Sequence, residues 1–274
     1  MKKNIKIIAL LTALLLGSAA GCASVPTAPQ GLIQTDGTPG EDAAKSENLL
    51  TADFAVDWMA LVCNIIGAES LPPPPASRLI AYAGVAVYES VLPALTGYRT
   101  LSGQLNEMPA MPRPEAGMLY NWPAAIASAE AAVLKGLLPQ LSDNSSAAID
   151  NLVNKQTGTQ KSVPADIIRR SEAFGETVVN AILGWADEDG YKDTRNKIYT
   201  PPTGPGMWEP GPPGYKPALE PYWGDLRTFA LYSVDSCVPP APFVYSTDNT
   251  SAFFQQALCV YDTYQHLTEE EKEI

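Results

Sequence analysis

The placement of the prolines constrains the fold of this 274-residue chain more than any other feature. The chain has 25 prolines, which gather in a few stretches instead of being spread evenly. A proline in a helix interior breaks the helix, and one in a central strand removes a ladder hydrogen bond. Regular structure is therefore expected in the proline-poor stretches, and the proline-rich stretches predict long connecting segments.

The proline-poor stretches carry apolar residues every three or four positions, which is the spacing of a helix face. The pattern predicts helices over 48–68, 76–92, 122–138, 142–156, 164–187 and about 250–265. Pro72 to Pro75 are expected to form a stiff extended connector, and Gly190 to cap the helix that ends at Asp187. No stretch shows sustained strand alternation. The predicted fold class is all-α, a helical bundle with long loops rich in proline and aromatic residues.

Composition narrows the class of function. With 46% apolar and 18% charged residues the chain can bury a core, unlike a disordered chain. Its formal net charge of −12 repels phosphate backbones, so nucleic-acid binding is not expected. The chain has one histidine, His266, which excludes a histidine-rich metal site and any mechanism with two imidazoles. His266 is expected at a helix end, where a positive imidazole suits the helix dipole.

The N-terminus has the layout of an export signal. A basic start is followed by an apolar run at 7–16, which is too short to span a bilayer but suits a signal-peptide core. Small residues then precede Cys22, and this arrangement resembles the bacterial lipobox, whose cysteine is diacylated. The resemblance implies a lipid at Cys22 and, since Ala23 follows, a place in the bacterial cell envelope at the outer membrane, facing the periplasm. A plain secretory signal cleaved near Ala20 is the alternative.

The expected domain organisation has three parts. Residues 1–21 form the signal peptide, and 22–46, rich in proline, glycine and threonine, form a flexible tether. Residues 47–274 form the helical domain. Within it, the segment from Tyr199 to Pro242 holds eleven prolines and many aromatic residues. We expect it to bury large rings along an extended backbone laid over the helices.

Two groups of residues are candidates for a disulfide bond or a metal site. Cys63, Cys237 and Cys259 lie in an exported chain, so two of them could pair, or all could be buried thiols. Asp187, Asp189 and Asp193 around Gly190 superficially resemble a calcium loop, which needs a glutamate at its twelfth place. Counted from Asp187, that place is Ile198. The aspartates are therefore expected at a solvated helix end, and no metal site is predicted.

Catalytic candidates are similarly weak. Glu209 and Glu220 could form an acid/base pair of carboxylates, but nothing in their spacing supports it. The chain contains no GxSxG, Walker loop, GxGxxG or SxxK motif. The residues alone thus predict no catalytic, cofactor-binding or metal-binding residue, and Cys22 as the lipid attachment site.

Three stretches carry a family resemblance: 78–89 (RLIAYAGVAVYE), 122–132 (WPAAIASAEAA) and 199–210 (YTPPTGPGMWEP). With the following 212–215 (PPGY) and 220–224 (EPYWG), they resemble bacterial vanadium-dependent haloperoxidases, in the type 2 phosphatidic acid phosphatase superfamily. The resemblance implies an all-α fold of two helical-bundle halves. Vanadate, or phosphate in the phosphatases, is held in the later half by a lysine and an arginine, a Ser-Gly-His element and a final arginine followed by histidine.

This sequence has no Ser-Gly-His element and one histidine, so no catalytic residue is carried over and vanadate is expected only in an intact relative. Thr268 and Glu271 form a capping box that begins a helix shortly before Ile274. Together these features predict a truncated N-terminal half, inactive alone; a frayed natural tail is the alternative. The expected partners are the membrane, through the lipid, and either a second copy or a separately encoded C-terminal half. A non-enzymatic helical binding or assembly lipoprotein is the alternative function.

Overall fold

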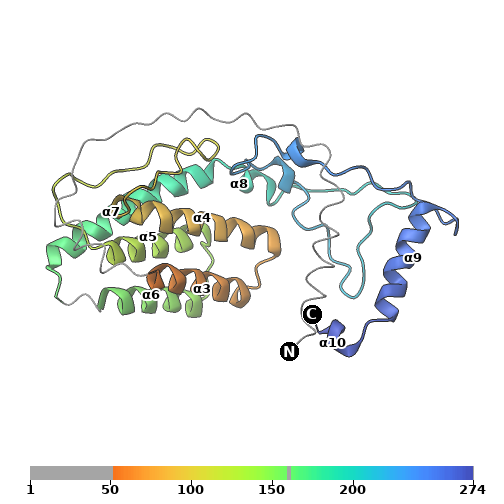
Figure 1. Ribbon diagram of the computed structural model, residues 1–274, viewed down its shortest axis with the longest axis horizontal. Coiled ribbons are helices and arrows are strands. Elements are labelled where there is room, and N and C mark those ends of the chain that lie inside the picture. Colours follow the sequence, from red (N-terminus) through yellow and green to blue (C-terminus); the bar gives the residue numbers. More distant parts are fainter. Residues whose placement is uncertain (1–51, 159–161, 274) are drawn as a thin grey trace, which may run out of the picture. The chain divides into compact units, whose positions relative to one another are not determined.

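The computed structural model describes residues 52–158 and 162–273, so Cys22, the signal peptide and the tether lie outside the described residues. The described ranges hold eight α-helices, α3 to α10, which are labelled in Figure 1. Their bounds are α3 Asp53–Ala68, α4 Pro73–Val91, α5 Trp122–Leu137, α6 Asp143–Gly158, α7 Ala165–Asp187, α8 Tyr191–Thr194, α9 Ala252–Gln265 and α10 Glu269–Lys272. Within the described ranges the only β pairing is an isolated bridge between Ser102 and Leu105. The all-α prediction is confirmed.

Helices α3 to α7 pack side by side, and α5 touches each of the other four (Figure 1). The sequence of α5 explains its central place, because it is rich in alanine and its small side chains let neighbouring backbones approach. The tightest approach is to α7, where an added Cβ on Gly175 would collide with the carbonyl oxygen of Ala125. Gly175 therefore sets the distance between the two helices.

The apolar stripe predicted for α7 faces the core. Phe174, Val178, Ile182 and Trp185 are buried, and Ser171 lies among them. On α3, Trp58 is fully buried and its indole nitrogen donates to the side-chain oxygen of Gln156 at 2.8 Å. Helical periodicity thus correctly identified the inward face of α7, and on α3 it included the buried Trp58.

The prediction of an extended connector over Pro72–Pro75 is wrong after its first residue. Pro72 has extended backbone, with φ −63° and ψ 155°, and α4 begins at Pro73. The first turn of a helix has no intrahelical partners for its N–H groups, and the proline ring presets a helical φ. Three prolines in succession can therefore begin a helix that they could not continue.

Gly190 does not cap α7 as expected. The C-cap is Glu188, and Gly190, with φ +88°, is the N-cap of the short helix α8. Glycine adopts this positive φ without strain, so Gly190 can join the end of α7 to the start of α8.

The aromatic segment over 199–242 is mostly not buried, which corrects the prediction made for it. Phe229 packs against the core, whereas Tyr215 and Tyr232 are exposed. Helix α9 forms where expected, but none of its residues is buried. Large rings thus lie on the surface of this part of the chain, and burial by the helical body does not explain them.

The expectations for the cysteines also fail. Cys63, Cys237 and Cys259 are all free and all exposed, so they neither pair with one another nor lie in the core. Cys63 belongs to α3, but its side chain is exposed while those of Val62 and Ile65 are buried. No helix in the described ranges combines the length and apolar character needed to cross a bilayer.

Candidate functional site

A buried polar cluster centred on Asp189 joins three distant segments. The Asp189 carboxylate accepts hydrogen bonds from Arg78 Nε at 2.6 Å and from the Tyr82 hydroxyl at 2.9 Å. It also accepts from the Tyr191 backbone N–H at 2.9 Å. Asp189 is 4% exposed, so the expectation of a solvated helix end is wrong for this residue. Its negative charge is compensated by Arg78, which α4 supplies from 111 positions away in sequence.

Arg227 closes the other side of this cluster. Its Nη2 donates to the Trp185 carbonyl at 2.6 Å and to the Tyr82 hydroxyl at 3.3 Å, and its guanidinium lies over the Trp185 ring. Its Nη1 is buried without a hydrogen bond and lies 3.7 Å from Glu107. Phe229 follows and meets the rings of Tyr82 and Trp185 edge-on at 5.0 Å each. The segment 227–229 is therefore the part of the aromatic region that the bundle holds.

The cluster controls the protonation of Tyr82. Burial raises the pKa of this phenol above its ordinary value, and the adjacent negative charge of Asp189 raises it further. Tyr82 consequently stays a neutral hydrogen-bond donor. Together with the ion pair beside it, the phenol fixes the end of α7 against α4.

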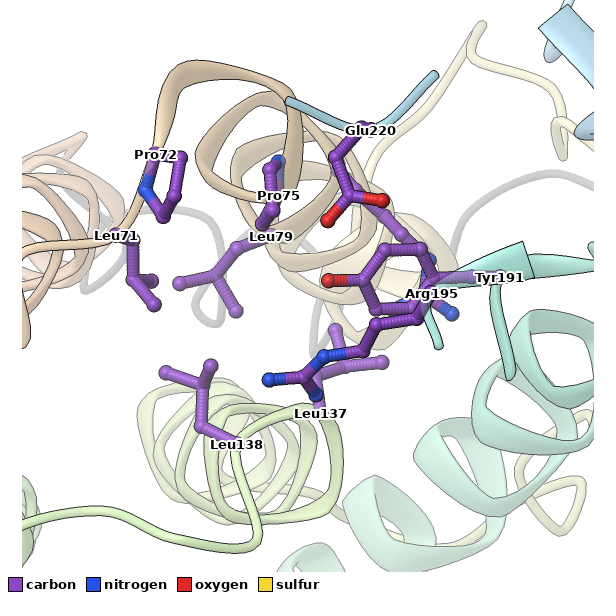
Figure 2. Close-up of a pocket in the computed structure, with 10 residues that line it drawn as sticks. Leu71, Pro72, Pro75, Leu79, Leu137, Leu138, Tyr191, Arg195 and Glu220 are labelled. Atoms are coloured by element: carbon purple, nitrogen blue, oxygen red, sulfur yellow. The ribbon is translucent and has the colours of Figure 1, made fainter. Parts of the chain in front are cut away.

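A cavity of about 120 Å³ lies against this cluster, between α4, α5, α8 and the loop at Glu220 (Figure 2). Tyr191, Arg195 and Glu220 reach toward it from one side, facing leucines that include Leu71 and Leu138. Glu220 has left-handed backbone, with φ +43°, which is uncommon for a residue other than glycine. The cavity therefore offers a cation, a carboxylate and a phenol opposite an apolar wall.

The charged residues around this cavity shift the pKa of Tyr191 in opposite directions. Burial raises the pKa of the Tyr191 phenol, and Glu220 raises it too, while Arg195 and Arg78 lower it. Arg78 is committed to Asp189, and its guanidinium also lies 4.6 Å from the centre of the Tyr191 ring. Arg195 has no ion pair with any described carboxylate. Of the two cations that line the cavity, Arg195 is therefore the one available to an anionic ligand.

Two further acids are buried in the bundle. Glu89 accepts from the Leu101 N–H at 2.6 Å and from the Thr100 hydroxyl at 3.0 Å, which ties the loop after α4 to the helix. Glu130 on α5 is fully buried, and its carboxyl oxygens have no hydrogen bond. Burial raises the pKa of Glu130 well above 4.5, although the nearby backbone N–H of Val87 lowers it. Glu130 is therefore carried in the core as a neutral acid.

The other sequence candidates do not converge. Glu220 lines the cavity but Glu209 does not, so the structure forms no acid/base pair from them. His266 is the C-cap of α9, as expected, and its Nδ1 lies 2.6 Å from the carbonyl oxygen of Asp262. In the part of the chain that the structure describes, no group of three or more histidine, cysteine, aspartate or glutamate side chains could hold a metal ion.

Sequence reasoning missed Asp189 as a buried charge and did not single out Arg195. One feature of the sequence pointed weakly to the buried cluster. Arg78, Tyr82 and Glu89 all belong to the stretch 78–89, which carries the family resemblance. Arg78 and Tyr82 bind Asp189 after the end of α7, and Glu89 binds the loop that follows α4. The resemblance in that stretch thus marks residues that hold the fold together.

Similarity to known proteins extends over most of the chain. No protein-family model matches it, and no curated protein matches it. Among solved structures, it is similar to one described as the first bacterial vanadium-dependent iodoperoxidase, with a TM-score of 0.71 and 30% sequence identity. The match covers 82% of this chain and 53% of that one, so the chain spans about half the length of this relative. The predicted haloperoxidase-like fold is confirmed.

Proposed function

We propose that this chain, with its haloperoxidase-like fold, forms the N-terminal helical half of a vanadium haloperoxidase-like or phosphatase-like enzyme. The observation that carries the proposal is the extent of the match, 82% of this chain but 53% of the iodoperoxidase. In this proposal the oxyanion chemistry belongs to a second half, in which the family resemblance places the vanadate or phosphate ligands. The chain by itself is then catalytically inactive.

The residues of the described part do not fit a vanadate site. Two arginines lie close together in the bundle, but Arg78 is neutralised by Asp189, and Arg227 donates to the Trp185 carbonyl. The single imidazole, His266, ends the exposed helix α9. An oxyanion needs several free cationic donors around one point, with an imidazole beside them. We therefore assign no catalytic step to these residues.

The exposed apolar surface of the C-terminal region supports a missing partner. On α9, Val260, Tyr261 and Tyr264 are each at least 60% exposed. A contiguous apolar face of this kind is typical of a surface that another protein segment covers. In the proposal that segment is the second half of the enzyme, joined to this chain or encoded separately. A second copy of the chain is the competing occupant.

Activity and vanadate binding test the enzymatic proposal. The purified chain alone should show neither vanadate-dependent iodide oxidation by peroxide nor hydrolysis of a phosphate monoester, and vanadate should leave its Tm unchanged. A clear rise in Tm would overturn the claim that the oxyanion site lies elsewhere. Sequencing the source DNA beyond codon 274 in all three frames completes the test. A frame with Ser-Gly-His and a later Arg-His supports the proposal, and its absence refutes the enzyme-half assignment.

The alternative is a non-enzymatic helical lipoprotein that binds or assembles other components. Its support is the exposed aromatic surface over 199–245, which half an enzyme does not require. Size-exclusion chromatography with light scattering separates the two functions. A true binding module should be monodisperse, whereas an uncovered half should self-associate through its apolar face.

We also propose that the chain is held in the bacterial cell envelope by a lipid on Cys22, at the periplasmic face of the outer membrane. Several acyl chains on one residue anchor a protein firmly, whereas a single chain does not. Cys22→Ser should abolish labelling by radioactive palmitate and release the protein from the membrane fraction. Cys63→Ser, which changes another cysteine, is the matched control and should change neither. Palmitate labelling that survives Cys22→Ser would contradict the assignment.

A further inference from the structure

A larger cleft of about 520 Å³ opens beside the cavity of Figure 2, and Arg195 and Glu220 line both. Its other walls come from the loop that runs from Lys197 to Pro221. Pockets for small ligands have volumes of about 300–1,000 Å³, so this cleft has the size of a binding site. Neither the haloperoxidase-like fold nor the proposed function assigns a role to it.

The cleft concentrates positive charge in an acidic protein. Arg195, Lys197 and Lys216 line it against one acid, Glu220, although the whole chain has a formal net charge of −12. Lys197 is partly engaged, because its Nζ lies 3.9 Å from Asp225. Arg195 and Lys216 form no ion pair with any described carboxylate. Two cations are therefore ready to bind an anion.

Aromatic faces lie beside these cations. Trp208 is 49% exposed and Tyr199 is 39% exposed, and both line the cleft. Tyr199 is held in place, since it meets the Tyr222 ring edge-on at 5.8 Å and the Tyr222 hydroxyl donates to the Ile198 carbonyl at 2.9 Å. A flat apolar ligand that stacks on these rings removes their surface from water, and this burial favours binding. Aromatic surface and unpaired cations thus occur in the same hollow.

The walls of the cleft are stiff. Four prolines line it and restrict the backbone before any ligand binds. Gly206 in the same loop has a φ of +77°, and an added Cβ there would collide with the Tyr245 ring. The turn at Gly206 therefore packs closely against Tyr245. A rigid wall loses little conformational entropy on binding, which favours affinity for a small ligand.

We infer that this cleft binds a small aromatic carboxylate, with the ring against Trp208 and Tyr199 and the carboxylate at Arg195 and Lys216. A guanidinium matches the planar carboxylate, and the exposed rings match the aromatic part. With Lys197 paired to Asp225, two unpaired cations face one acid, Glu220, and the resulting formal charge of +1 suits a monoanion better than a polyphosphate. The inference concerns this chain alone and does not rest on the proposed function.

Calorimetric titration of the full chain tests the inference with three probes. 2-Naphthoate should bind at one site, while the neutral 2-naphthamide and inorganic phosphate should each bind at least about tenfold more weakly, a difference of about 1.4 kcal/mol. Equal binding of naphthoate and naphthamide would refute the role of the cations. Tighter binding of phosphate would refute the role of the rings, and no binding of naphthoate would refute the site.

Variants locate the site. Lys216→Gln and Trp208→Ala should each raise the Kd for 2-naphthoate by about tenfold, with the helical circular dichroism unchanged. Lys192→Gln is the matched control, because Lys192 pairs with Asp187 and does not line the cleft. If Lys192→Gln weakens binding as much as Lys216→Gln, the attraction is a general effect of surface charge and the assignment is wrong. The comparison of probes on the unchanged protein stands even if a variant fails to fold.

Discussion

Replacing Asp189 by alanine tests whether the buried polar cluster holds the end of the bundle together. In the protein, this carboxylate accepts hydrogen bonds from Arg78 Nε, the Tyr82 hydroxyl and the Tyr191 N–H, at 2.6, 2.9 and 2.9 Å. The Asp189 side chain is 4% exposed and that of Arg78 is 10% exposed. Water therefore cannot replace the lost carboxylate, and the guanidinium would remain buried without its counter-charge.

The expected loss follows from these contacts. A hydrogen bond to a charged group contributes about 1.5–3 kcal/mol and an ordinary one about 1 kcal/mol. All three bonds end on the charged carboxylate, and at the lower limit of about 1.5 kcal/mol each they give about 4.5 kcal/mol. Removing one member of a buried ion pair typically costs about 3–5 kcal/mol. We therefore expect Asp189→Ala to lower the free energy of unfolding by about 4.5 kcal/mol.

Urea titration followed by circular dichroism and tryptophan fluorescence measures this loss. Asp150→Ala is the control, because Asp150 lies 2.7 Å from Lys135 but both side chains are more than 40% exposed. A surface pair of this kind contributes about 0–1 kcal/mol. If Asp189→Ala costs less than about 1 kcal/mol, or no more than Asp150→Ala, the cluster does not stabilise the fold as argued.

Three other outcomes are expected. Burial raises the pKa of Glu130, so above the unfolded-state pKa of about 4.5 the unfolded chain binds fewer protons than the folded one, and stability falls as the pH rises. Glu130→Gln should remove that slope, which is at most about 1.4 kcal/mol per pH unit, and parallel urea profiles of the two proteins from pH 5 to 8 would contradict this. Gly175→Ala should lower the free energy of unfolding by about 1–3 kcal/mol through its clash with Ala125, whereas Gly184→Ala, whose Cβ meets open space, should raise it by about 0.5–1 kcal/mol. Similar effects in urea titrations of both variants would refute the role of Gly175. Ellman's reagent should modify the three described cysteines without denaturant, and protection of any of them would show that its exposure is wrong.

The lengths and inward faces of the helices were predictable because the information is local. Helices α5, α6 and α7 begin and end within about two residues of their predicted bounds. Proline placement and apolar spacing act over a single turn or two, so they can be read from neighbouring residues. The capping box at Thr268 is equally local, and it forms as expected, with the Thr268 hydroxyl accepting from the Glu271 N–H.

Local rules failed where the partner lay far along the chain. Pro73 was predicted to lie outside a helix, because a proline inside a helix is destabilising. It is instead the first residue of α4, where a proline is tolerated. The cavity and the cleft share Arg195 and Glu220, which are separated by 24 intervening residues of loop without helical or strand periodicity. No pattern in the sequence brings such residues together.

The sequence by itself determined the all-α class, the inward face of α7 and the haloperoxidase-like resemblance. Tertiary structure alone decided the role of Asp189, because burial and the pairing with Arg78 convert a residue typical of a solvated helix end into the centre of a buried cluster. It also decided which aromatic residues pack, since Phe229 enters the core while Trp208 stays on the surface. The physical reason is common to both. Burial and charge pairing depend on which segments meet in space, and periodicity along the chain carries information only about each segment's own helix.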